Sequence, residues 1–90
     1  MYYVYVLESL IDYNKYTGCT EDLKHRLYLH NTGKVESTKE RKPFRIIYYE
    51  GCINKEDAYH RERYLKSSWG KRYLNNRLKQ YFSNKENPVG

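Results

Sequence analysis

The sequence lacks the features that define several classes of protein. Its two cysteines, Cys19 and Cys52, stand far apart with no CxxC spacing, which argues against a disulfide framework and against a zinc site. No apolar run approaches the roughly 20 residues that a membrane-spanning helix needs. No signal peptide opens the chain. We therefore expect a reduced, cytoplasmic protein.

Apolar residues are scarce, whereas tyrosine and positive charge are abundant. Hydrophobic residues make up 39% of the 90-residue chain, and the mean hydropathy is −1.06. Twelve tyrosines compensate, because each supplies a large apolar ring with a polar tip. Lysine and arginine total 17 against 11 acidic residues, so the net charge is +6. This excess predicts a polyanionic partner, with nucleic acid first and an anionic membrane surface second.

The first eighteen residues have the pattern of a β-hairpin. Residues 3–7 and 16–18 are rich in residues that favour strands. Between them, Asp12 and Asn14 are turn formers. We expect a loop over residues 8–15 and two paired strands that bring Tyr5 close to Tyr16. The register is open at this point, so the sequence does not say whether the two rings share a face.

The rest of the chain predicts one more strand and three helices. We expect a helix capped by Thr20 and ending near His30, and then a strand over 44–50. A second helix, capped by Asn54, follows. After a break at 68–70, a third helix carries one apolar stripe: Leu74, Leu78, Tyr81 and Phe82. The first strand is apolar on both faces and should be central. We predict an α+β domain over residues 1–82, with a three-stranded antiparallel β-sheet, the order β-β-α-β-α-α, and a disordered tail over 83–90.

A long polar loop over residues 34–43 separates the first helix from the third strand. Long loops are usually functional or mobile, so this one is either a solvated connector or a nucleic-acid flap. Cations of this loop and of other segments are the expected nucleic-acid contacts: Lys15, Lys34, Lys39, Arg41, Lys42, Lys71 and Arg72.

Three polar side chains fall on or beside helix stripes that should be buried. His30 shares a stripe with Leu23 and Leu27, and Arg26 lies at its edge. Glu62 lies on the inward stripe of the second helix, where a charge is costly unless it is paired. Taken alone, His30 could complement the helix dipole, Arg26 could be a surface cation, and Glu62 could pair with Lys66. Together with a tyrosine, they supply what phosphodiester hydrolysis needs: a base, a cation and a carboxylate for a metal ion.

In chain order, these residues resemble the GIY-YIG nuclease family. The matching features are Tyr3-Val4-Tyr5, Tyr16-Thr17-Gly18, the Arg26–His30 pair and Glu62. The runs 34–50 and 69–74 are similar to small, stand-alone bacterial members. The chain departs from the family at Tyr3, Val4 and Thr17, which replace a glycine and two isoleucines. The resemblance also implies an asparagine after the metal ligand, for which Asn76 is the candidate and Asn75 the alternative.

The resemblance implies a mechanism with one Mg²⁺ or Mn²⁺ ion held by Glu62. Arg26 would offset charge on the phosphate, and either motif tyrosine would take the proton of the attacking water. His30 would relay that proton or position the tyrosine. A free phenol has a pKa near 10, so we expect Arg26, Lys15 and the metal to lower it and activity to rise towards alkaline pH.

The resulting hypothesis is a metal-dependent endonuclease that acts on DNA in preference to RNA. Choice of substrate by structure, and a role in DNA repair or recombination, belong to the same hypothesis, with a monomer as the default. One alternative is a nucleic-acid-binding module of the same fold without turnover. The other is a scaffold domain, in which the polar cluster would be a buried network and affinity for nucleic acid would show little salt dependence.

Overall fold

The fold is built on β1 (Tyr2–Ser9), the central strand of a three-stranded antiparallel sheet. The computed structural model describes residues 1–86, and for residues 85 and 86 it describes the backbone only. The other elements are β2 (Lys15–Thr20), α1 (Leu23–Asn31), a 3₁₀ turn (Lys39–Arg41), β3 (Phe44–Cys52), α2 (Lys55–Lys66), α3 (Ser68–Arg77) and α4 (Lys79–Glu86). The predicted α+β class, the antiparallel sheet and the central first strand are confirmed.

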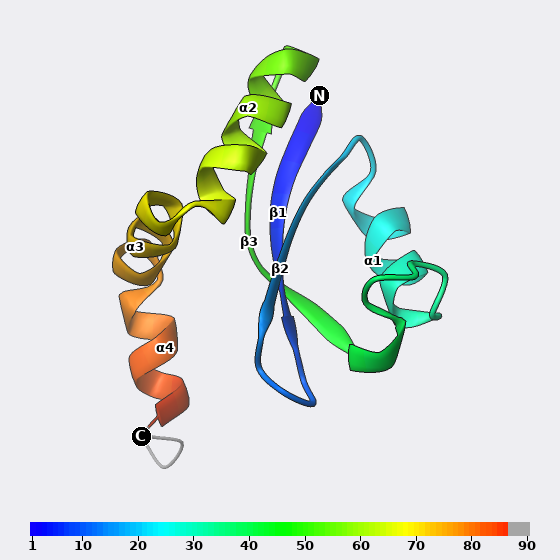
Figure 1. Cartoon of the computed structure of the whole chain (residues 1–90), viewed down its shortest axis with the longest axis vertical. Helices are drawn as coiled ribbons and strands as arrows, with labels where there is room; N and C mark the ends of the chain where they lie inside the picture. The colour runs from blue at the N-terminus through cyan, green and yellow to red at the C-terminus, as the bar shows by residue number, and fades with distance from the viewer. Residues whose placement is uncertain (87–90) are drawn as a thin grey trace.

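Helices cover both faces of the sheet, which explains why β1 is apolar on both sides. Figure 1 shows α1 on one side of the strands and α2 to α4 on the other. Val4 and Val6 point to the second side and pack with Ala58, Leu65 and Leu74. Tyr5 and Leu7 point to the first side, where they pack with Phe44 and with the partly buried Leu23, Leu27 and Ile46. The alternation of β1 therefore divides the core in two.

The register of the hairpin answers a question that the sequence left open. Tyr5 pairs with Gly18, and Leu7 pairs with Tyr16. Residues that pair directly across antiparallel strands point to the same face, so Tyr5 and Tyr16 share the α1 side. The loop is shorter than predicted because both strands extend further, to Ser9 and from Lys15.

Helix caps confirm one prediction and correct two. Asn54 caps α2 by accepting the backbone N–H of Asp57, as predicted. Asp22, not Thr20, caps α1, because the Thr20 hydroxyl instead accepts the N–H of Asp22 before the helix begins. The break after α2 falls at Ser67, which caps α3, so residues 68–70 form the first turn of α3 rather than the break itself.

The predicted third helix is two helices, α3 and α4, divided at Leu78. Because α4 runs to Glu86, residues 83–86 are helical and the tail predicted from residue 83 is wrong for them, while residues 87–90 lie outside the described part. Tyr81 attaches α4 to the sheet by donating its hydroxyl to the buried carboxylate of Glu8 at 2.5 Å. No helix in residues 1–86 is long and apolar enough to cross a membrane.

Candidate active site

Gly18 makes room for the phenol of Tyr5 at the edge strand β2. A Cβ atom at Gly18 would lie 2.5 Å from Tyr5 Oη and 2.6 Å from Tyr5 Cζ, closer than side-chain atoms normally approach. The ring of Tyr5 therefore lies across the backbone of β2, with its hydroxyl directed towards the sheet edge. Only 2% of Tyr5 is exposed, so its hydroxyl depends on protein partners.

Helix α1 supplies two of those partners. Arg26 Nε donates a hydrogen bond to Tyr5 Oη at 3.3 Å. His30 is fully buried, and its Nε2 lies 3.0 Å from the same oxygen. The ring centroid of Tyr16 lies 4.9 Å from that of His30 and 6.4 Å from that of Tyr5. The structure thus brings together Tyr5, Tyr16, Arg26 and His30, four of the residues that the sequence singled out.

Thr38, a buried residue of the loop over 34–43, completes this cluster, and no sequence pattern pointed to it. Its Oγ1 lies 2.8 Å from His30 Nδ1, and it is fully buried although it follows a run of polar residues. A threonine in a polar loop has no periodicity that marks it as buried, so only the folded path of the loop identifies it.

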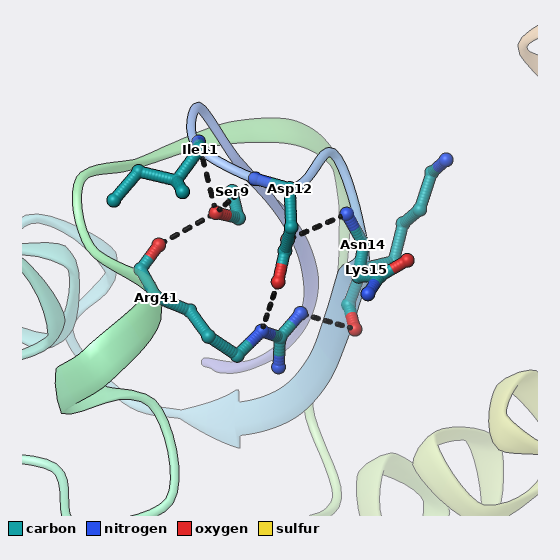
Figure 2. A network of polar contacts seen from close by, with 6 residues as sticks. All are labelled: Ser9, Ile11, Asp12, Asn14, Lys15 and Arg41. Carbon is teal, nitrogen blue, oxygen red and sulfur yellow. Dashed lines mark hydrogen bonds and ion pairs between the residues drawn. The ribbon is translucent and has the colours of Figure 1, made fainter.

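The same loop is tied to the hairpin rather than free, as Figure 2 shows. The hydroxyl of Ser9 donates to the backbone carbonyl of Arg41 at 2.6 Å. The Arg41 side chain donates to Asp12 Oδ2 at 3.2 Å and to the carbonyl of Lys15 at 3.4 Å. The guanidinium of Arg41, expected to contact nucleic acid, is therefore already bound within the chain.

Electrostatics in the cluster contradict one expectation. Burial raises the pKa of Tyr5 above its usual value near 10; the hydrogen bond from Arg26 opposes the rise, whereas the charge of Glu62 adds to it. Burial, with the nearby charge of Arg26, lowers the pKa of His30 to about 4. The expected lowering of the Tyr5 pKa is thus wrong for the protein alone. Lys15 does not help, because its Nζ lies 3.7 Å from Glu8 and 4.7 Å from the centroid of Phe82.

The orientation of α2 is fixed by Arg61, the residue before Glu62. Arg61 donates two hydrogen bonds to the carboxylate of Glu50 on β3, at 2.7 and 3.2 Å. Such a two-pronged contact holds geometry better than a single bond does. It sets the rotation of the helix and therefore the direction in which the next side chain, Glu62, leaves it.

Glu62 is largely buried, with 20% of its side chain exposed, and its carboxylate is 3.0 Å from Lys66 Nζ. Its charge contributes to the raised pKa of Tyr5, and, after burial, to that of the Cys19 thiol in β2. The charge of Glu62 is therefore close enough to the hairpin to act on both groups. Within residues 1–86, no group of three or more His, Cys, Asp or Glu side chains is arranged to hold a metal ion. A single hard oxygen ligand fits Mg²⁺ or Mn²⁺ that keeps several waters.

Comparison with known proteins decides the family. The model of the GIY-YIG catalytic domain matches residues 1–75. The chain belongs to the GIY-YIG family. A UPF0213 protein of Oceanobacillus iheyensis is 42% identical over 66 residues, which are 72% of this chain and 76% of that protein. A UPF0213 protein of Streptococcus pyogenes is 46% identical over 65 residues, or 71% and 70% of the two chains.

A solved structure agrees with this assignment. The solution NMR structure of a UPF0213 protein from Bacillus halodurans is 37% identical, has a TM-score of 0.50, and the match covers 82% of each chain. The four clustered side chains and Glu62 all lie within the part of the chain that matches the catalytic domain.

The GIY-YIG match ends at Asn75, which the structure places differently from Asn76. A groove of about 570 Å³ lies between the sheet and α3–α4, and Asn75 lines it together with Lys66 and Lys71. Both asparagines are exposed, but Asn76 is not among the lining residues. At 100° per residue it lies well away from the groove-facing stripe of α3.

The other cationic side chains expected to contact nucleic acid differ in their contacts within the chain. Lys34, Lys42, Lys71 and Arg72 are exposed. Lys42 donates to the carbonyl of Lys39, and Lys39 pairs with Glu36 at 3.1 Å. The guanidinium of Arg72 lies 5.1 Å from the ring of the exposed Trp69. Contact with nucleic acid stays a prediction for all seven cations.

Proposed function

We propose that the chain is a divalent-metal-dependent nuclease that hydrolyses phosphodiester bonds in DNA. The observation that carries the proposal is the hydrogen-bonded set of Arg26, Tyr5 and His30 beside Gly18, with the charge of Glu62 close enough to act on Tyr5. A phosphate at this edge would meet a guanidinium, a phenol and a carboxylate. This combination suits the charge and proton requirements of phosphodiester hydrolysis.

Tyr5 is the base in this proposal, and His30 takes the proton that Tyr5 loses. As water attacks phosphorus, its proton passes to Tyr5 Oη while the phenol proton passes to His30 Nε2. The 3.0 Å separation of these two atoms suits such a relay. The pKa of His30, lowered to about 4 by burial and the charge of Arg26, keeps the ring neutral before the reaction but makes it a weak base, so the relay depends on the negative charge of the bound phosphate to favour the imidazolium. Tyr16 has no comparable link to His30 Nε2, so Tyr5 is preferred as the base. Arg26 would stabilise charge on the phosphate.

Glu62 would hold the metal ion, which supplies Lewis-acid stabilisation of the leaving oxygen when bound. Without a metal ion, Lys66 Nζ pairs with this carboxylate at 3.0 Å, and because the Lys66 side chain is exposed it can move away into solvent at little cost. We assign the family's asparagine to Asn75 rather than to Asn76, because Asn75 lines the groove with Lys66. Selection of the substrate by its structure, and a role in DNA repair or recombination, are part of the same proposal.

The direct experiment is a cleavage panel. Supercoiled plasmid, linear duplex, branched DNA, single-stranded DNA and RNA are incubated with the protein in Mg²⁺ or in EDTA. We expect metal-dependent nicking of at least one DNA and weaker action on RNA. Binding without nicking on every substrate would support the non-catalytic module instead. Weak binding with little dependence on salt would support the scaffold.

The relay has a consequence for the pH dependence of cleavage. Because the Tyr5 pKa is raised, a free phenolate is scarce near neutral pH, and a mechanism that needed one would gain about tenfold in kcat/KM for each pH unit. A neutral phenol that passes its proton to neutral His30 has no such requirement. We therefore expect kcat/KM to be level between about pH 7 and pH 9. A steady rise over this range would contradict the relay and restore the phenolate mechanism expected from the sequence.

A further inference from the structure

We propose that Thr38 is a positioning residue for this site: its hydroxyl accepts the Nδ1–H of His30 and thereby keeps His30 Nε2 free to accept the proton of Tyr5. The catalytic consequence of this inference rests on the proposed function. The structural claim, that His30 carries its proton on Nδ1, is independent of that function.

The contacts around Thr38 favour one assignment of the proton on His30. The Thr38 hydroxyl has a single proton, and the carbonyl of Val35, 3.4 Å from Oγ1, is an acceptor that can take it. Thr38 Oγ1 then offers a lone pair to His30 Nδ1 at 2.8 Å, and we assign Nδ1 as the donor. A neutral imidazole carries one N–H, so Nε2 is an acceptor.

Tyr5 is the donor that this acceptor requires. Arg26 Nε already donates to the phenol oxygen, so the phenol proton is available for His30 Nε2. The result is one directed chain from Arg26 through Tyr5 and His30 to Thr38, in which each group donates to the next. Because the Tyr5–His30 and His30–Thr38 contacts are both buried, neither is in competition with water.

The loop that carries Thr38 is held at both ends. The side chain of Asn31, just before the loop, accepts the N–H of Phe44, just after it, at 2.6 Å and donates to its carbonyl at 3.1 Å, so the two ends are joined. Near the other strand, Arg41 is bound to Ser9 and Asp12 of the hairpin (Figure 2). The loop therefore also serves as a brace that presents Thr38 to His30, a role beyond the two expected from its composition.

The first test observes the imidazole directly. In protein labelled with ¹⁵N at histidine, without metal or nucleic acid, a long-range ¹H–¹⁵N spectrum distinguishes the two neutral tautomers. The His30 signals are assigned by their loss in His30→Gln. We expect the Nδ1–H form in the wild type and in Thr38→Ser, and a shift towards the Nε2–H form in Thr38→Val. An Nε2–H form in the wild type would overturn the proposal whether or not the chain cleaves DNA.

The second test measures cleavage with the same variants. Loss of an outer partner that orients a functional histidine typically lowers activity about 10- to 100-fold, and we expect that loss in kcat for Thr38→Val. Thr38→Ser should keep most of the wild-type rate. The matched control is Thr32→Val, whose hydroxyl donates to the carbonyls of Tyr28 and Leu29 at the exposed end of α1. Wild-type kcat in a folded Thr38→Val protein with a changed tautomer would overturn the positioning role.

Discussion

Replacing Glu62 by Gln should abolish cleavage while DNA binding and the fold persist. The substitution keeps the shape of the side chain but removes the anionic ligand, and the lost stabilisation of several kcal/mol corresponds to a rate loss of about 1,000-fold. Stability should change little, because the ion pair with Lys66 at 3.0 Å is partly exposed. Single-turnover cleavage in Mg²⁺ and fluorescence anisotropy with labelled DNA in EDTA measure the two properties separately.

The matched control is Glu56→Gln, which removes the same charge from an exposed position on α2. It should cleave at the wild-type rate. If Glu62→Gln cleaved as fast as this control, the carboxylate would have no part in the chemistry. If it instead lost DNA binding and unfolded at a lower temperature, Glu62 would have a structural role.

Replacing Tyr5 by Phe should lower kcat by about 100- to 10,000-fold, the usual contribution of a positioned base. The ring stays in the core, but Arg26 and His30 Nε2 both lose their partner. The unmet acceptor on the buried His30 should cost about 1–3 kcal/mol of unfolding free energy. Chemical denaturation measures this cost, and single-turnover kinetics measure the catalytic loss.

Two other Tyr→Phe variants make this result specific. Tyr3→Phe removes a hydroxyl from the same strand, where the ring contacts Tyr49, and it should be nearly neutral. Tyr16→Phe tests the other motif tyrosine and should reduce activity much less than Tyr5→Phe does. A greater loss from Tyr16→Phe would assign the base to Tyr16 and remove the relay through His30.

Local patterns in the sequence predicted most of the fold. The two apolar faces of β1 indicated a central strand, and the capping pattern at Asn54 placed the start of α2. The errors have local causes. Asp22 and Thr20 are both good caps, and their competition is decided by a hydrogen bond between them. The division at Leu78 has no glycine or proline to mark it.

The candidate site was less accessible to sequence reasoning. Periodicity placed His30 and Glu62 on inward stripes, and the motifs identified the tyrosines. The register that puts Tyr5 over Gly18 and the loop path that buries Thr38 are long-range features with no local pattern. The raised pKa of Tyr5 follows from its burial, whose extent only the packed structure reveals.

The most direct test of a single shared site is to map a paramagnetic ion on the protein. With ¹⁵N-labelled chain and a small fraction of one equivalent of Mn²⁺, amide signals close to the bound ion broaden. We predict broadening of the β2 residues around Gly18 and of α2 residues around Glu62 in the wild type, and its loss in Glu62→Gln. Broadening that survives this substitution, or that occurs only at the acidic starts of α1 and α2, would contradict the account.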